Sequence, residues 1–419
     1  MIKNQSLRIG RAGLSGAGSL AANIKEHLGP NALRWYVAQV SKDELTIEAT
    51  LQTDGLNQFE RRGEPGFYPG KSAVLHIVPT GIGCNIGGYA GDAAPVTNLL
   101  AAASDYLITH PNAVNASDFV GLDSSGNVVY TDGYSLDLFC QGLVDLHVPY
   151  SNKIGLVIEH AKQEDLEVVF NVLNTVRAVH GVNITDFVIT EKSIGGRCVE
   201  NGSGAFVGTL DNPQVLFSAC EKLLQRGVDA LAITSNISDL PLENYAKHFA
   251  GCYPNPVGGV EAVISYLVTN RYKVPAAHAP LMNIKQLDLA SNVVDARGAG
   301  EMVSASGLAC ILIALRRAPQ ITRRPGARVK NSLSLDNLLA VVSPASCLGG
   351  IPALYTREQN IPLVAVQENE TILEVTQSQL GLPNVVEVRN YAEAAGVVLA
   401  LKHGLSLESI SRPLGTLRL

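Results

Sequence analysis

Short apolar runs recur along the chain from Lys71 onward, and amphipathic stretches lie between them. Continuous apolar runs are typical of strands that are buried on both faces, and helices between such strands indicate a parallel sheet. We therefore predict an α/β fold with largely parallel sheets, flanking helices and two domains or lobes. The predicted strands are Val74–Val78, Tyr106–Ile108, Ile154–Ile158, Phe187–Ile189, Ala230–Ile233, Val274–Ala277, Leu338–Val342 and Leu363–Val366.

The amphipathic stretches have the spacing of helices that pack one face against a sheet. A further helix is expected to begin near Ala94, after a glycine-rich loop. The predicted helices are Glu164–Val179, Asn212–Arg226, Val257–Thr269, Glu301–Arg316 and Pro352–Gln359.

Residues 1–70 follow a different pattern, in which apolar and polar residues alternate. This alternation predicts two strands, Leu33–Val40 and Glu44–Gln52, in a small β-rich appendage. Stretches rich in glycine and proline at 61–70 and 319–327 are candidate boundaries. We therefore expect an N-terminal β-rich segment (1–70), a main α/β domain (71–318) and a C-terminal α/β unit (331–419) that completes the site.

The composition narrows the class of protein. Hydrophobic residues make up 46% of the chain and charged residues 17%, which indicates a globular protein and excludes a disordered one. The net charge of −6 and the scattered basic residues argue against nucleic-acid partners. The apolar segment Ala305–Leu315 is too short to span a bilayer, and the N-terminus lacks a secretory pattern. The seven cysteines include no CxxC pair, which favours reduced thiols and a cytoplasmic location.

Polar or titratable residues follow almost every predicted strand, where parallel sheets bind their ligands. His110, Asn112, His278, Glu368 and Asn369 are examples. The first strand runs into a loop, PTGIGCNIGGYAGDAAP, whose glycines would let backbone N–H groups converge on an anion or a flat polar ligand. The loop lacks the dinucleotide fingerprint and the Walker lysine, so we predict a substrate cradle and no cofactor. Its predicted binding residues are Thr80, Gly81, Gly83, Gly87 and Gly88.

A second loop, SPASCLGGIP, places Cys347 near a predicted helix N-terminus, where the macrodipole would lower a thiol pKa. Cys84 has the corresponding place in the first loop. The two thiols could form a proton-transfer pair, or one could be a nucleophile with His110, His160 or His278 as its base. Alternatively, both are small buried residues of the core. Gly349 and Gly350 would bind substrate through their backbone amides.

Two further regions contribute candidate residues. Arg197 lies among glycines and suits a carboxylate or phosphate, whereas Glu261 in a helix first turn suits the helix dipole or catalysis. The nine histidines are dispersed and show none of the usual metal-ligand spacings. A metal site built from strand ends remains open, but we predict no cofactor.

Five stretches of the sequence resemble a bacterial family known only as a domain of unknown function, which is frequent in cyanobacteria. They are HIVPTGIGCNIGGYAGDAAP, YLITHPNAVNASDF, VVYTDGYSLDLF, NPVGGVEAVISYLVTNRYKVPAAHAP and VAVQENETILEVT, and the resemblance extends from about Ser72 to the C-terminus. The resemblance implies no reaction or cofactor, and it implies non-thiol residues at the positions of Cys84 and Cys252. It therefore favours Cys347, Thr80, Asp92, His110, Asn112, Asn115, Asp132, Glu261, His278, Glu368 and Asn369 as site residues.

From these observations we expect a non-redox hydrolase or lyase that acts on a small polar substrate, either anionic or amide-bearing. Backbone amides of the two loops, with Asn112, Asn115, Asn369 and Arg197, would bind it. The alternatives are a two-cysteine racemase or isomerase without a cofactor, in which Cys84 and Cys347 face one another across a cleft, and a non-catalytic metabolite-binding protein. The expected partner is a small molecule, without nucleic acid or membrane, and a homo-oligomer stays open. The predicted catalytic residues are Cys347, Cys84, His110, His278, Asp92 and Glu368.

Overall fold

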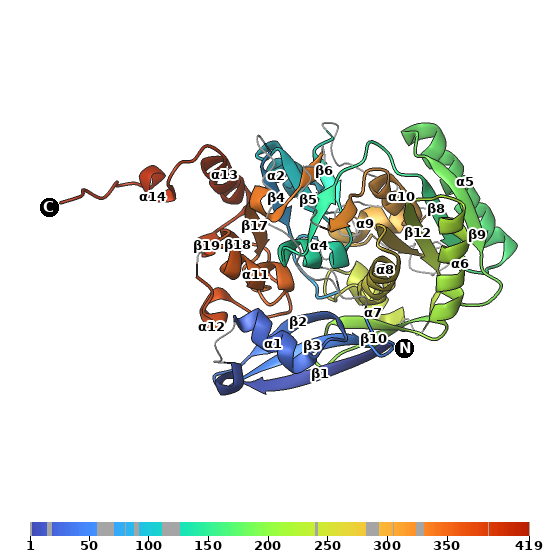
Figure 1. Cartoon of the computed structure of the whole chain (residues 1–419), viewed down its shortest axis with the longest axis horizontal. Helices are drawn as coiled ribbons and strands as arrows, with labels where there is room; N and C mark the ends of the chain where they lie inside the picture. The colour runs from blue at the N-terminus through green and yellow to red at the C-terminus, as the bar shows by residue number, and fades with distance from the viewer. Residues whose placement is uncertain are drawn as a thin grey trace.

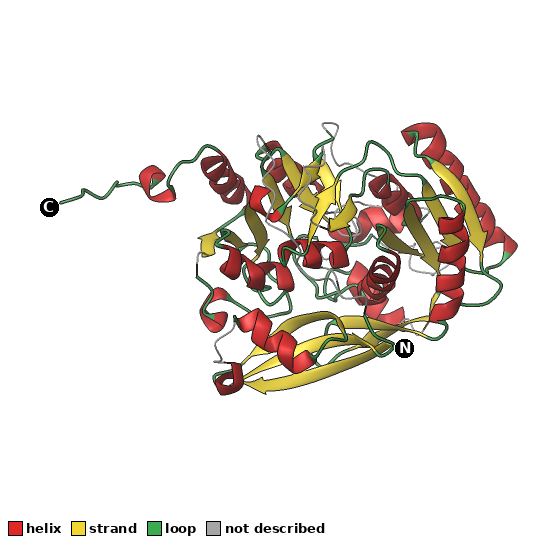
Figure 2. Ribbon diagram, in the orientation of Figure 1, coloured by secondary structure: helices red, strands yellow, loops and turns green. Residues whose placement is uncertain are grey.

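Two parallel sheets with helices on their faces form the body of the chain, and an antiparallel sheet lies at the N-terminus (Figures 1 and 2). This arrangement is seen in a computed structural model, and it confirms the α/β fold class. The structure describes residues 2–14, 19–56, 71–79, 81–87, 92–110, 126–238, 242–281, 293–304, 306–323, 331–383 and 385–418.

The first parallel sheet has six strands in the order β19-β18-β17-β4-β5-β6. Its strands come from two distant parts of the chain, because β17 pairs with β4. Helices α2 (Ala94–Ala102) and α13 (Tyr391–Lys402) pack on one face, and α4 (Gly133–Cys140) and α11 (Ile351–Gln359) pack on the other. The strands are β4 (Ala73–His76), β5 (Tyr106–Thr109), β6 (Val128–Tyr130), β17 (Leu338–Pro344), β18 (Leu363–Val366) and β19 (Val385–Val388).

The second parallel sheet has four strands in the order β14-β12-β8-β9. Helices α5 (Gln163–His180) and α10 (Leu308–Leu315) cover one face, and α6 (Pro213–Gln225) and α8 (Gly258–Tyr272) cover the other. The strand order reverses between β8 and β12, which is where doubly wound sheets open a crevice for ligands. The strands are β8 (Ile154–Ile158), β9 (Ile184–Ile189), β12 (Ala230–Ser235) and β14 (Ala276–Pro280).

The N-terminal sheet is antiparallel, with the order β1-β3-β2, and it lies across the ends of both parallel sheets (Figure 1). Its alternating pattern buries one face, and Trp35, Val37 and Ile47 join the largest hydrophobic cluster of the protein. This sheet therefore belongs to the same core as α4, α8 and α11. Its elements are β1 (Ile2–Gly10), α1 (Leu20–Leu28), β2 (Ala32–Val40) and β3 (Glu44–Gln52).

Shorter elements connect these layers.

Within the described ranges, no single helix is long and apolar enough to cross a bilayer. Helices α9 (Ala296–Val303) and α10 reach that length and composition only as a pair bent by 91°. After α13 the chain leaves the body, and residues 403–418 are almost all exposed (Figure 1). The remaining elements are β7 (Val144–His147), β10 (Gly196–Glu200), β11 (Phe206–Leu210), β13 (Ile237–Ser238), α7 (Leu242–Phe249), α9 (Ala296–Val303), β15 (Gln320–Arg323), β16 (Ser332–Leu333), α12 (Gln377–Leu380) and α14 (Leu407–Ile410), with 3-10 turns at Arg11–Leu14 and Leu335–Asn337.

One prediction about elements is wrong. The single helix expected over 301–316 is two helices, α9 and α10, because the chain turns at Ser304 and Ser306 accepts the Leu308 N–H at 3.1 Å. The linker expected over 319–327 contains strand β15, which pairs antiparallel with β7. The division of residues 71–419 into two units stays a prediction, and in the structure β17–β19 extend the sheet begun by β4–β6.

Candidate functional site

A cavity of about 180 Å³ lies where the N-terminal sheet meets the helices between the two parallel sheets. It is lined by β2, the loop after β4, the end of β5, helices α4 and α8, and the turn that opens α11. The cavity therefore joins segments that are far apart in the sequence. Its polar lining residues are Arg34, His76, His110, Asp137, Tyr266 and Cys347, and its apolar ones include Trp35, Val37, Ile82, Leu136, Ile351 and Leu373.

Strand β2 reaches the cavity through a close backbone contact with the turn before α11. The Val37 N–H donates to the Gly349 carbonyl at 3.0 Å, and Tyr36 forms an isolated antiparallel bridge with Gly350. A Cβ at position 349 would lie 2.3 Å from the Val37 carbonyl oxygen, so only glycine allows this approach. The turn predicted from SPASCLGGIP thus holds the N-terminal sheet against the cavity.

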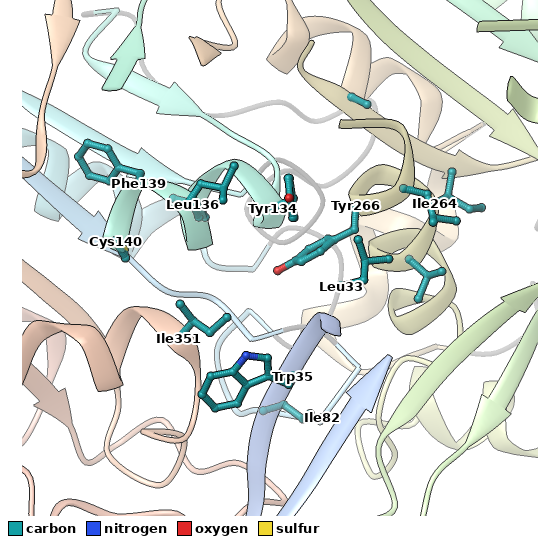
Figure 3. Packing of buried hydrophobic residues seen from close by; sticks show 14 of the residues in the cluster. Leu33, Trp35, Ile82, Tyr134, Leu136, Phe139, Cys140, Ile264, Tyr266 and Ile351 are labelled. Atoms are coloured by element: carbon teal, nitrogen blue, oxygen red, sulfur yellow. The ribbon is translucent and has the colours of Figure 1, made fainter. Parts of the chain in front are cut away.

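Asp137 and Tyr266 form a buried pair at the cavity. The Tyr266 hydroxyl donates to Asp137 Oδ2 at 2.8 Å, and Figure 3 shows the Tyr266 ring projecting from α8 towards the space between Leu136 and Trp35. Burial raises the pKa of Asp137 to about 7, although the bond from Tyr266 and the charge of Arg34 lower it. The carboxyl group is therefore able to gain or lose a proton near neutral pH.

Arg34 contributes a positive charge to this lining. Its guanidinium carbon lies 5.5 Å from the centre of the Tyr36 ring. No carboxylate lies within 4.0 Å of it among the described residues. Burial dominates the pKa shifts of Asp137, His110 and Cys347, and the Arg34 charge lowers all three pKa values. These groups therefore share one electrostatic environment.

Two histidines line the cavity with unsatisfied ring nitrogens. His76 Nδ1 lies 3.1 Å from Thr97 Oγ1, whereas His76 Nε2 and His110 Nδ1 have no hydrogen-bond partner in the described part of the chain. Burial lowers the pKa of His76 to about 3 and that of His110 to about 4. Both rings are therefore neutral near pH 7, and a neutral ring can donate or accept a hydrogen bond to a ligand.

The two thiols singled out in the sequence have different places. Cys347 lines the cavity, whereas Cys84 is absent from its lining, and the Cys84 Sγ lies 3.3 Å from the carbonyl oxygens of Pro79 and Ile86. Burial raises the pKa of Cys347 to about 12, so the expectation that a helix N-terminus lowers it is wrong. Burial also raises the pKa of Cys84, and the nearby Cys347 raises it further. Both groups are therefore thiols at neutral pH.

A second polar cluster lies at the carboxyl edge of the four-stranded sheet. Ser235 Oγ lies 2.8 Å from His278 Nε2, and His278 Nδ1 lies 3.4 Å from Glu261 Oε1. Burial lowers the pKa of His278 to about 3, so its ring is neutral. Nearby, Glu159 accepts hydrogen bonds from the Ser193 hydroxyl at 2.5 Å and the Asn236 N–H at 3.2 Å. Ser235 itself is fully buried.

The family resemblance is confirmed by comparison with known proteins. Residues 72–411 match the model of a family described as a protein of unknown function, DUF3326. The chain belongs to the DUF3326 family. It is also 35% identical, over 340 residues, to a protein of a Synechococcus strain named as an uncharacterised lipoprotein; the match covers 80% of this chain and 92% of that protein.

The DUF3326 match divides the cavity lining into two parts. His76, His110, Asp137, Tyr266 and Cys347 lie inside the matched residues. Arg34, Trp35, Tyr36 and Val37 of β2 precede them. The N-terminal sheet therefore adds a charged wall to a cavity whose other walls belong to the family.

Glycines with positive φ values and hydrogen bonds to Asn369 fix the conformation of the glycine-rich loop of this DUF3326 chain. Gly81, Gly83 and Gly87 have positive φ values of 75°, 57° and 83°, which other residues rarely adopt. Asn369 Oδ1 accepts the Ile86 N–H at 2.8 Å, and its amide donates to the Ile86 carbonyl at 2.9 Å. These glycines shape the loop, and Ile82 between them reaches the cavity wall.

The other predicted residues have various places. Asn369 also donates to the Tyr391 hydroxyl at 2.9 Å, and Glu368 accepts the Tyr391 N–H at 3.1 Å, so both anchor the start of α13. Asp92 accepts the Gly87 N–H at 2.6 Å, and burial raises its pKa to about 6. Arg197 forms a surface ion pair of 2.5 Å with Asp211. Thr80, Gly88, Asn112 and Asn115 lie outside the described residues.

Of the predicted residues, the structure gathers His110, Cys347, Gly349 and Gly350 at the cavity. Sequence reasoning missed Arg34, His76, Asp137 and Tyr266 there. A histidine within an apolar strand and an aspartate within an apolar helix are signals that could have identified two of them. The described residues contain no cluster of three or more side chains arranged to hold a metal ion.

Proposed function

We propose that this protein is a proton-transferring enzyme of the lyase or isomerase class that acts on a small molecule bound in the cavity. The observation that carries the proposal is Asp137, a buried carboxyl group with a pKa of about 7 in the cavity lining. Catalytic acids and bases work best when their pKa lies near the working pH. Strongly shifted carboxyl groups inside cavities are candidates for this role.

The neighbours of Asp137 support the same chemistry. Its ionised form would take a proton from a carbon beside a substrate carbonyl, and the electron pair of that C–H bond would move onto the carbonyl oxygen. The neutral rings of His76 and His110 could donate hydrogen bonds to that oxygen through their unpartnered nitrogens. Tyr266 holds Asp137 Oδ2, which fixes the direction of the carboxyl group. The protonated Asp137 would then return the proton.

The size of the cavity limits the substrate. An apolar cavity of about 150 Å³ holds a molecule as large as benzene. At about 180 Å³, the cavity fits a substrate of comparable size. Its apolar residues would contact the body of that substrate, and its polar ones would contact the reacting end.

Deuterium exchange tests this function whatever the product of the reaction is. The protein is incubated in D₂O with a panel of small ketones, oxo acids and carboxylic acids, and proton NMR follows the loss of C–H signals. We expect the wild type to exchange hydrogen beside a carbonyl of at least one compound, and Asp137→Asn to slow that exchange about 100-fold or more. Asp165, a half-buried residue at the start of α5 and outside the cavity lining, supplies the control, Asp165→Asn, which should exchange like the wild type.

Two results would contradict the proposal. One is unchanged exchange in a folded Asp137→Asn variant, and the other is no exchange by the wild type of any compound that stabilises it against heat. The second result would favour the alternative of a non-catalytic metabolite-binding protein. Such a protein would need the cavity but not the proton transfer.

Hydrolysis is the second candidate function, supported by Ser235, His278 and Glu261. Ser235 Oγ lies within hydrogen-bond distance of His278 Nε2, as a nucleophile and its base require, and Glu261 Oε1 lies 3.4 Å from the other ring nitrogen, on the side where a residue that orients the base would lie. Ser235 Oγ would attack a substrate carbonyl carbon while its proton passes to His278 Nε2 and then to the leaving group; water would release the acyl group in the same way. This candidate ranks second because Ser235 is fully buried.

Covalent labelling distinguishes the second candidate from a structural cluster. Phenylmethylsulfonyl fluoride should sulfonylate Ser235 in the folded wild type, as seen by peptide mass spectrometry, and His278→Ala should abolish the adduct. Ser343→Ala, at another buried serine, is the control and should label like the wild type. An unlabelled Ser235 in the folded wild type, or an adduct that persists in His278→Ala, would exclude hydrolysis at this cluster.

A two-thiol racemase is not favoured, because Cys84 does not line the cavity and burial raises the pKa of both thiols.

A cytoplasmic location is supported by the seven free cysteines, whereas the Synechococcus relative is named a lipoprotein. Cell fractionation with an antibody against the chain tests the location, and the membrane fraction would hold the protein if the proposal is wrong.

A further inference from the structure

We propose that Arg34 binds the carboxylate of the substrate, so that the N-terminal sheet sets the substrate class as a small carboxylic acid with an apolar body. The inference rests on the proposed function, because it concerns the same cavity. It goes further in assigning the recognition of the acid to a segment that precedes the family match at residues 72–411.

The charge balance of the cavity is the first argument. Arg34 has no carboxylate within salt-bridge distance among the described residues. The acid that shares the cavity, Asp137, is protonated in a large fraction of molecules at neutral pH. His76 and His110 are neutral there. The cavity therefore carries excess positive charge, and an anionic ligand would neutralise it with a charge-assisted hydrogen bond.

The unsatisfied polar atoms are the second argument. His76 is 1% exposed, and its Nε2 has no hydrogen-bond partner among the described residues. His110 Nδ1 also has no hydrogen-bond partner among the described residues. A buried polar atom without a partner costs about 1–3 kcal/mol, so a ligand atom that accepts a hydrogen bond from such a nitrogen in the cavity wall would recover this free energy. A planar carboxylate offers two acceptor oxygens, one for Arg34 and one for a histidine N–H.

The apolar walls identify the rest of the ligand. Trp35, Ile82 and Ile351 all line the cavity and are among the buried hydrophobic residues drawn in Figure 3. Leu136 and Leu373 extend the apolar surface. A phosphate or sulfate ion alone would leave these walls without contacts, whereas a carboxylic acid with a short alkyl or aryl group would cover them.

Matched pairs of acids and amides test the inference. The probes are butyrate, 2-oxobutyrate and benzoate, each compared with its neutral amide, together with inorganic phosphate, and the readouts are thermal stabilisation and calorimetric affinity. We expect at least one acid to stabilise the wild type and its amide to bind about 10- to 100-fold more weakly. Arg34→Gln should weaken acid binding by a similar factor. Arg8→Gln, on the exposed side of the same sheet, should have no effect.

A second pair of variants tests the role of the sheet without touching Arg34. Gly349→Ala places a methyl group 2.3 Å from the Val37 carbonyl and should displace β2, which weakens acid binding. Gly396→Ala, on the exposed side of α13 and outside the cavity lining, meets no atom within 4 Å and should bind like the wild type. Equal binding of acid and amide by the wild type, tighter binding of phosphate than of any acid, or full acid binding by Arg34→Gln would each overturn the inference.

The outcomes separate this inference from the proposed function. If Arg34→Gln keeps full acid binding while Asp137→Asn loses deuterium exchange, the carboxylate assignment fails and the proton-transfer function stands. If Arg34→Gln loses acid binding while Asp137→Asn exchanges normally, the proposed function fails and the carboxylate site stands.

Discussion

At the scale of single residues, Asp137 links the charge state of the cavity to the stability of the protein. Burial raises its folded pKa to about 7, above the ordinary value of about 3.9, so the folded state holds a proton that the unfolded chain releases. Its contribution to stability is complete below about pH 4 and is lost as the pH rises towards 7. The cavity therefore maintains a protonatable acid at a cost in stability near neutral pH.

This linkage predicts a difference between the wild type and Asp137→Asn. Between pH 5 and pH 7, the wild type should lose about 2 kcal/mol more unfolding free energy than the variant, because asparagine carries no titrating proton. Urea unfolding of both proteins at pH 5 and pH 7 measures this change in unfolding free energy. Asp165→Asn should follow the wild type, and parallel curves for the wild type and Asp137→Asn would show that Asp137 has an ordinary pKa.

The thiols give a second residue-scale prediction. Cys252 is exposed, whereas the other six cysteines are buried or half-buried, and burial raises the pKa of Cys347 and Cys84. Because the thiolate is the reactive form, only Cys252 should react quickly with Ellman's reagent at pH 7.5. Absorbance should report one fast thiol in the native protein and seven in denaturant, and Cys252→Ser should abolish the fast phase. A second fast thiol at Cys347 would revive the thiol mechanisms.

At the scale of elements, Asn369 joins the glycine-rich loop to the start of α13. Asn369→Ala would leave the Ile86 N–H and carbonyl and the Tyr391 hydroxyl without this partner. We expect a loss of about 2–3 kcal/mol in unfolding free energy, measured by urea denaturation. Gln367→Ala, at an exposed neighbour, should change stability by less than about 0.5 kcal/mol. Similar values for both variants would show that the loop does not need this anchor.

Comparison of the predicted and observed elements shows which parts of the fold and of the site the sequence predicts. Runs such as Ile154–Ile158 predict their strands because full burial requires continuous apolar residues. The sequence cannot reveal that Arg34 on β2 and Asp137 on α4 line the same cavity, because their common location depends on how the N-terminal sheet packs against α8 and α11. The glycines of the first loop suggested a cradle for a ligand. Three of them have positive φ values, and this backbone requirement gives the same sequence signal as a binding role.

At the scale of the whole molecule, the C-terminal residues 403–418 extend away from the rest of the structure. Residues 403–418 are almost all exposed, and Leu417 is 98% exposed. Limited proteolysis should therefore remove this tail first, and mass spectrometry of the products would identify the cleavage sites. The trimmed protein should keep its melting temperature within about 2 °C of the uncut protein. A large drop in melting temperature after trimming would show that the tail packs on the protein, for instance in a homo-oligomer.

The position of the N-terminal sheet has a practical consequence for anyone who handles this protein. Strand β1 begins at Ile2, and Asn4 donates a hydrogen bond to the Gly208 carbonyl at 3.1 Å, so a purification tag fused at this end would crowd the sheet whose next strands wall the cavity. A tag or surface linker at the opposite end would follow the outstretched tail into solvent. Ligand screens and immobilised assays are therefore best built on C-terminal fusions.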